Sequence, residues 1–216
     1  MFNFFTPHKR LAIVDLETTG LNFNRDQITE VGVIIINDGV IEQKFHSLVN
    51  PQCPLPPFIS QLTGITTADL KNAPVFSQIS AELFQLLQGS LFIAHNAKFD
   101  YSFLRQSFAA VNLNFQLDQL CTVQFARALF PHYHKHSLES WIPRLGIAPE
   151  RRHRAIDDAQ VVLDLLQYIE TNVHPETLQS TWASFSRKAT NPPLLNPDTM
   201  ATLPESPGVY IFEDQQ

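Results

Sequence analysis

Asp15 and Glu17 are a pair of acidic residues whose spacing could hold a divalent cation. They follow residues 11–14, an apolar run of strand length, and Gly20 marks a turn after them. Because side chains alternate along a strand, both carboxylates project from one face, where they repel by about 2 kcal/mol at about 7 Å and an effective dielectric of about 20. A cation between them relieves that repulsion, and oxygen ligands favour Mg²⁺ or Mn²⁺. A solvated turn carrying two acids explains these residues alone equally well.

Asp100 is a third acid in an unusual position. A helix is predicted after Asn96, whose side chain is suited to cap it, and Asp100 falls in the first turn of that helix. There it shares a face with Phe103 and Phe108, a buried direction that a solvated aspartate avoids. The favourable interaction of a carboxylate with the helix dipole is the simpler alternative. The buried direction makes metal ligation the preferred interpretation.

Asp158 lies on the apolar stripe of a helix predicted over residues 155–170. Its neighbour Asp157 lies about 100° around that helix, among polar residues, and is predicted to be solvated. His153 comes five residues before Asp158, too far around a regular helix to share its face. We therefore predict that His153 lies in the loop before the helix, from which its ring could reach the same acidic site.

These side chains together have the composition of a site that hydrolyses phosphodiesters. One edge of an α/β sheet would gather acids that come from a strand and two helices. Four acids could bind two metal ions about 3.5–4 Å apart, which stabilise the attacking and leaving oxygens. A histidine with an ordinary pKa of about 6.5 could take a proton from the attacking water. The candidate metal ligands are Asp15, Glu17, Asp100 and Asp158, and the candidate base is His153.

The elements that must position these residues have the order of an α/β domain. Residues 37–39 are a hairpin turn signal between two β segments. Residues 51–57 are a Pro-rich loop, and a short helix near residues 68–70, which Thr66 or Thr67 could cap, follows it. Strands are predicted over residues 11–17, 27–36, 40–49, 91–94 and 117–121, and helices over residues 75–87, 97–111, 123–130, 138–145 and 155–170.

The composition indicates one folded core plus a tail. The chain has 216 residues, of which 44% are hydrophobic, and a formal net charge of -6, which argues against a strongly basic nucleic-acid coat. A phosphate-processing site can still borrow positive charge from metal ions. Cys53 and Cys121 form no paired motif, so we expect reduced thiols in a cytoplasmic protein. The first residues lack a signal-peptide pattern, and the longest aliphatic run, residues 31–36, is too short to span a membrane.

Two groups of basic or imidazole side chains have a less specific pattern. His132, His134 and His136 alternate between two predicted helices, but this spacing suits no helix face, so a solvated loop is preferred to a metal site. The candidate phosphate-binding cations are Lys98, Arg105 and the basic side chains of residues 151–154, with a plain solvated charge as the alternative for each.

Three segments of this chain resemble the three motifs of the DnaQ-like DEDDh 3′–5′ exonucleases. They are Val-Asp-Leu-Glu-Thr-Thr-Gly at 14–20, Ala-His-Asn-Ala-Lys-Phe-Asp at 94–100, and His-Arg-Ala-Ile-Asp-Asp-Ala at 153–159. The loop at residues 62–66 also looks like that of the family, and the similarity covers residues 9–170. The resemblance implies a ribonuclease-H-like α/β fold with a five-stranded mixed sheet flanked by helices. It also implies a two-magnesium site that releases nucleoside 5′-monophosphates from a 3′ end.

The resemblance carries roles over to individual residues. Asp15, Glu17, Asp100 and Asp158 match the metal ligands, and His153 matches the general base. Leu16 and Thr18 fall where the family contacts the terminal nucleotide, and Phe99 falls where it supports the site, although an apolar Leu16 or Phe99 is equally well explained as core.

The function expected from this resemblance is a Mg²⁺- or Mn²⁺-dependent 3′–5′ exonuclease of DNA in proofreading or repair. Its expected partners are the 3′ end of single-stranded nucleic acid and a DNA polymerase or a fused endonuclease domain. RNA 3′-end trimming is one alternative, because the sequence shows no decisive reader of the 2′-hydroxyl. A catalytically idle tethering domain is another, which the intact acids argue against.

The last part of the chain has a different pattern. We expect residues 1–172 to form the exonuclease domain and residues 173–202 to be a linker or tail, broken by Pro192, Pro193 and Pro197. Residues 203–216 resemble the opening of a GIY-YIG nuclease domain of the UvrC type. The second half of that signature is absent, so we predict no GIY-YIG activity for this chain, and an ordinary Pro-rich tail is the alternative.

Overall fold

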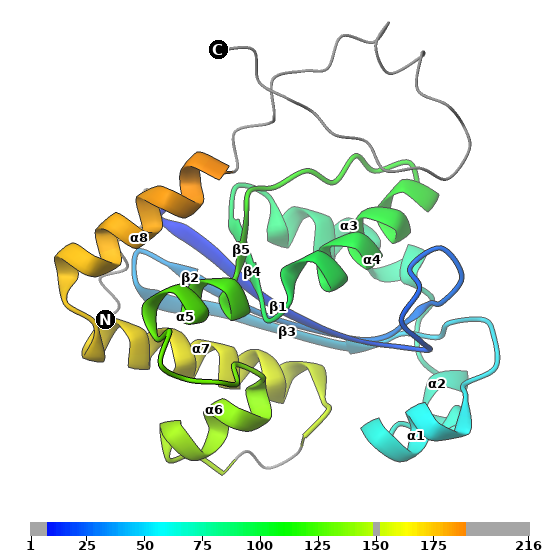
Figure 1. The fold of residues 1–216 in the computed structure, drawn as a ribbon. Coiled ribbons are helices and arrows are strands. Elements are labelled where there is room, and N and C mark those ends of the chain that lie inside the picture. Colours follow the sequence, from blue (N-terminus) through cyan, green and yellow to red (C-terminus); the bar gives the residue numbers. More distant parts are fainter. Residues whose placement is uncertain (1–7, 149–151, 189–216) are drawn as a thin grey trace, which may run out of the picture.

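A mixed five-stranded sheet forms the centre of the protein in a computed structural model, which describes residues 8–148 and 152–188 (Figure 1). The strand order is β3-β2-β1-β4-β5. β1 pairs with β2 in the antiparallel sense and with β4 in the parallel sense. The predicted five-stranded mixed sheet is therefore confirmed. The strands are β1 (Arg10–Thr18), β2 (Ile28–Asn37), β3 (Val40–Leu48), β4 (Leu91–Ala94) and β5 (Gln119–Cys121).

The hairpin between β2 and β3 forms where the turn signal predicted it. Asp38 and Gly39 both have positive φ, 46° and 77°, which is the backbone that a two-residue hairpin turn requires. β2 is buried along nearly its whole length, whereas β3 is an exposed edge strand. This difference explains why β2 is an almost unbroken apolar run and β3 is not.

Helices cover both faces of the sheet (Figure 1). One face, which includes Ala12 and Val14 of β1, packs against α3 and α4. The other face, which includes Leu11 and Ile13, packs against α5, α6, α7 and α8. The helices are α1 (Pro57–Thr63), α2 (Thr67–Lys71), α3 (Phe76–Leu87), α4 (Ala97–Ala110), α5 (Thr122–Leu129), α6 (Leu138–Leu145), α7 (Ala155–Asn172) and α8 (Pro175–Lys188).

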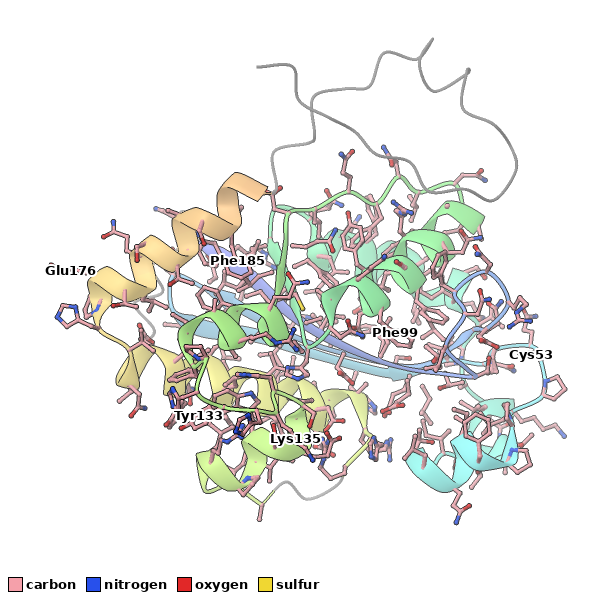
Figure 2. All side chains as sticks on the ribbon, viewed as in Figure 1. Cys53, Phe99, Tyr133, Lys135, Glu176 and Phe185 are labelled. Atoms are coloured by element: carbon pink, nitrogen blue, oxygen red, sulfur yellow. The ribbon has the colours of Figure 1, made fainter. Side chains whose placement is uncertain are left out.

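Two helices were not expected from the sequence. α1 lies between the predicted Pro-rich loop and Gly64, with Pro57 at its start and Gly64 in the left-handed conformation at its end. α8 lies within residues 173–202, which were predicted to be a linker. Its Leu178 is 3% exposed, and Figure 2 shows Phe185 between α8 and α5, where its ring lies 5.6 Å from that of Phe125. The linker prediction is therefore wrong for residues 175–188, because α8 covers apolar surface of α5. Residues 189–216, which include the GIY-YIG-like segment, lie outside the described residues.

The remaining local predictions concern caps and membrane segments. Thr66 caps α2 in a reciprocal capping box with Asp69, as one of the two expected caps. Over residues 8–148 and 152–188, no helix has both the length and the apolar character needed to cross a membrane. Both cysteines, Cys53 and Cys121, are free thiols.

Candidate active site

Asp15 and Glu17 lie at the carboxyl end of β1 and share the face that packs against α7. Both are half-buried, and they share one face of the strand, as its alternation predicted. Across the antiparallel pair, Asp15 lies opposite Gly32 and Glu17 lies opposite Glu30. A register shift follows between Glu17 and Thr18, so the regular ladder is interrupted next to the acid pair.

Asp100 approaches β1 from the first turn of α4 and is 3% exposed. Its Oδ1 accepts a hydrogen bond from the backbone N–H of Leu16 at 3.1 Å, which places this carboxylate beside the residue between the two β1 acids. Asn96 occupies the N-cap position with φ 77° and its side chain makes no capping hydrogen bond. The predicted side-chain cap is therefore wrong, and the left-handed backbone at Asn96 turns the chain from β4 into α4 instead.

Asp158 and His153 reach the site from α7 and from the loop before it. Asp158 is 5% exposed in the first turn of α7, and His153 lies two residues before the start of that helix with φ 58°. One ligand atom each of Glu17, His153 and Asp158 lie within 4.8 Å of one another. The structure thus brings together side chains that are 141 residues apart in sequence. Asp157 is half-buried rather than fully solvated.

Burial and mutual repulsion dominate the electrostatics of this cluster. Burial, followed by the charges of Asp100 and Glu17, raises the pKa of Asp15 well above its usual value. Burial also raises the pKa of Asp100 well above its usual value, and burial together with the charge of Glu30 raises the pKa of Glu17 to about 7. Such carboxylates bind protons because burial removes their water and because neighbouring negative charges repel them. A hard divalent cation would replace those protons, so the oxygen-rich donor set fits Mg²⁺ or Mn²⁺.

Arg152 is a cation in direct contact with one of the buried acids. Its guanidinium contacts the carboxylate of Asp158 and donates a hydrogen bond to Glu139 Oε1 at 2.9 Å. The sequence predicted basic side chains here for binding phosphate, and the structure places this one on a predicted metal ligand; Arg151 lies outside the described residues. Burial and the charge of Arg152 lower the pKa of His153 below its ordinary value, which favours the neutral ring. A neutral ring is the form that can accept a proton.

The three residues predicted to contact the nucleotide or to support the site all have contacts within the protein. Leu16 is 5% exposed within the core, so its side chain lies in the apolar interior and its backbone N–H holds Asp100. Thr18 is buried, and its Oγ1 donates a hydrogen bond to the carbonyl of Gly20 at 2.6 Å. Phe99 packs against Phe103 beside the sheet, with ring centroids 4.9 Å apart (Figure 2). Contacts of these three residues with a nucleotide stay predictions.

Glu30 is a buried acid that the sequence reasoning did not identify. The residue is 0% exposed, and burial alone would raise its pKa, but hydrogen bonds from His46, Arg154 and the Ala155 N–H outweigh burial and lower the pKa to about 2. The one available signal was a glutamate inside an otherwise apolar strand, since a buried charge needs a partner. The identity of the partner, Arg154, could not be read from the sequence because it lies 124 residues away.

The other candidate groups are the three histidines of residues 132–136 and two cations on α4. His136 is 6% exposed and packs near Trp141, with ring centroids 6.0 Å apart, so the predicted solvated loop is wrong for this histidine, although His132 and His134 are exposed. Lys98 and Arg105 are exposed on α4 and line an open cavity of about 1100 Å³ between α4 and β5.

Comparison of the sequence with known proteins identifies relatives of this chain. A protein of Mycobacterium tuberculosis, provisionally named a bifunctional exonuclease/endonuclease, is 35% identical over 213 residues, 93% of this chain and 33% of that protein. The PolC-type DNA polymerase III of Thermotoga petrophila is 36% identical over 161 residues, 74% of this chain and 12% of the polymerase. The 3′-5′ exonuclease DinG of Bacillus subtilis is 32% identical over 179 residues, 79% of this chain and 19% of DinG. The chain therefore spans a third or less of the length of these relatives.

A solved structure shows the same fold. Exonuclease I of E. coli in complex with a dA16 oligonucleotide superposes with a TM-score of 0.71 at 18% identity, covering 80% of this chain and 42% of that one. The exonuclease family model RNase_T matches residues 12–166, which include Asp15, Asp100 and Asp158. The chain belongs to this exonuclease family.

Proposed function

We propose that this chain is a metal-dependent 3′–5′ exonuclease that degrades single-stranded DNA to nucleoside 5′-monophosphates. The observation that carries the proposal is the convergence of Glu17, His153 and Asp158, whose ligand atoms lie within 4.8 Å of one another beside Asp15. Membership of the exonuclease family supports hydrolysis, and the relative named as a 3′-5′ exonuclease supports the direction.

The residues of the site have separate roles in the proposed reaction. Two Mg²⁺ or Mn²⁺ ions held by the four acids would stabilise the charge on the attacking and leaving oxygens of the phosphodiester. His153 accepts the proton of the attacking water through its neutral ring. Asp100 is held in one orientation by the backbone N–H of Leu16, which limits the reorganisation needed when a ligand binds.

We also propose a setting for the domain within a larger cytoplasmic protein. The alignment with the M. tuberculosis exonuclease/endonuclease covers 93% of this chain, more than the family model alone covers. This extent supports an exonuclease fused to an endonuclease domain. The resemblance of residues 203–216 to the start of a GIY-YIG domain supports that type of endonuclease, and we propose that the whole protein acts in DNA repair. The similarity to the PolC-type polymerase supports a polymerase as the alternative partner. The two free thiols are consistent with a reducing compartment.

The experiment that tests the activity is a time course on 5′-labelled single-stranded DNA and RNA of matched sequence. Each reaction contains Mg²⁺, Mn²⁺ or EDTA, and the Asp15→Asn variant is the control. We expect a metal-dependent ladder that shortens from the 3′ end of DNA and is missing in the control. A faster ladder on RNA would replace DNA degradation with RNA trimming. Absence of any ladder would overturn the exonuclease proposal and favour a tethering domain.

A further inference from the structure

Glu30 makes contacts that tie β2 to the start of α7. Its carboxylate accepts hydrogen bonds from Arg154 Nη2 at 2.7 Å and from Arg154 Nε at 3.0 Å. It also accepts the backbone N–H of Ala155 at 3.1 Å, and His46 Nε2 lies 2.6 Å from it. A carboxylate that receives a forked guanidinium and a backbone N–H is held in one orientation.

Gly32 lies two residues along β2 on the same face and adds a second constraint. A Cβ atom at Gly32 would lie 2.4 Å from the carbonyl carbon of Ala155 and 2.4 Å from the backbone nitrogen of Ile156. Real Cβ atoms essentially never come so close to backbone atoms, so the glycine allows the first turn of α7 to rest directly on β2. Glu30 and Gly32 thus hold the same turn by a polar clamp and by close packing.

Glu30 and Gly32 are also the cross-strand neighbours of the acid pair on β1. Glu17 pairs with Glu30 and Asp15 pairs with Gly32 in the β1–β2 register. The residues that hold α7 are therefore the direct strand neighbours of the acids on β1. The turn that they hold carries Asp158, and His153 immediately precedes Arg154.

We propose that Glu30 is a positioning residue, which acts through Arg154 and the Ala155 N–H to set the place of Asp158 and His153 relative to Asp15 and Glu17. Glu30 itself touches no substrate in this assignment. The inference rests on the proposed exonuclease function for its kinetic consequence, since misplacing catalytic groups by about 1 Å can cost about 100-fold in rate.

The test compares Glu30→Gln with Glu42→Gln in the full chain. Glu42 forms an ion pair with Arg10 between β3 and β1, so this control removes a cross-strand ion pair away from α7. We expect Glu30→Gln to lower kcat by about 10- to 100-fold, because it loosens the turn that places Asp158 and His153, with KM within about twofold. Glu42→Gln should leave both within about twofold. Both proteins are assayed well below their Tm, so that unfolding is not mistaken for a lower kcat.

A double-mutant cycle tests the route through Arg154. Because Glu30 acts in part through that guanidinium, the loss of rate in Glu30→Gln combined with Arg154→Gln should be smaller than the product of the two single losses. Fully multiplicative losses would contradict the assignment, because they would mean that the two residues act independently.

Hydrogen exchange of the α7 amides gives a readout that does not need activity. The Ala155 N–H has the Glu30 carboxylate as its acceptor, so its exchange should be about 10-fold faster in Glu30→Gln and unchanged in Glu42→Gln. An active wild type with unchanged kcat and unchanged exchange in Glu30→Gln would overturn the positioning role and leave the exonuclease intact. An inactive wild type would overturn the proposed function, and the exchange result would still decide the role of Glu30.

Discussion

Asp158 and Asp157 are adjacent acids in one helical turn, and their positions lead to opposite expectations. Asp158 is 5% exposed and faces Glu17 and His153, whereas Asp157 is half-buried with no ligand atom in that group. We expect Asp158→Asn to lower kcat by about 100-fold or more through loss of metal binding. Asp157→Asn should stay close to the wild-type rate. Initial rates on labelled single-stranded DNA check the pair, and a dead Asp157→Asn would mean that the assigned ligand is the wrong one.

His153 should control the acid side of the pH–rate profile. Its pKa is lowered from 6.5 by burial and by Arg152, so the wild-type rate should fall only at a pH below 6.5, where the ring becomes protonated. His153→Ala should be slower by about 10²–10⁴-fold and should lose this acid limb. The measurement is kcat against pH at saturating Mn²⁺, which keeps carboxylate protonation out of the profile. An unchanged profile in the variant would argue against the base role.

Individual site residues differ in how readily they can be predicted from the sequence. Asp15 and Glu17 could be predicted because strand alternation fixes their common face, and Asp158 because it interrupts an apolar helical stripe. Arg152 and Glu30 could not be assigned correctly. Their positions depend on pairings with Asp158 and Arg154 that exist only once the loop before α7 has folded against the sheet.

Among the elements, α7 does most to assemble the site, since it packs on both β1 and β2 and carries Asp158. The helical periodicity of its apolar residues made α7 predictable. The apolar runs in the sequence made β2 and β4 predictable in the same way. α1 had usable signals in Pro57 and Gly64, but seven residues are too few for a clear period. α8 has apolar residues at helical spacing, yet the surface that it covers belongs to α5, and no local pattern shows such a contact.

The packing of α8 leads to a stability prediction at this scale. Leu178 is 3% exposed in a segment predicted from the sequence to be a linker. We expect Leu178→Ala to lower the free energy of unfolding by about 2–4 kcal/mol, because it leaves a cavity in the contact with the domain. The exposed neighbour Gln179 provides the control, and Gln179→Ala should change that free energy by less than about 0.5 kcal/mol. Urea titrations of the two variants measure both values, and equal midpoints would show that the packing of Leu178 adds no stability.

For the whole molecule, the acid cluster should make the metal-free protein less stable as the pH rises. Glu17 has a pKa of about 7 in the folded chain against 4.5 as its ordinary value, and the pKa values of Asp15 and Asp100 are also raised. A group with a raised pKa in the folded state contributes stability below its unfolded pKa and loses it as the pH passes the folded value. Folding therefore becomes progressively less favourable between pH 4.5 and about 7 on account of these groups.

The Asp15→Asn variant isolates this effect, because groups with the opposite trend are common to both proteins. His95, whose pKa burial lowers to about 4, and Glu30, whose pKa is about 2, lose stability towards acid and cancel in the difference. In EDTA we expect Asp15→Asn to have a higher Tm than the wild type, by a margin that grows from pH 5 to pH 8. Added Mn²⁺ should reverse the order at pH 8, since the wild type binds the ion and the variant does not. The bound cation would then offset the destabilisation that the buried carboxylates cause. A wild type that is more stable than Asp15→Asn in EDTA at pH 8 would refute this account.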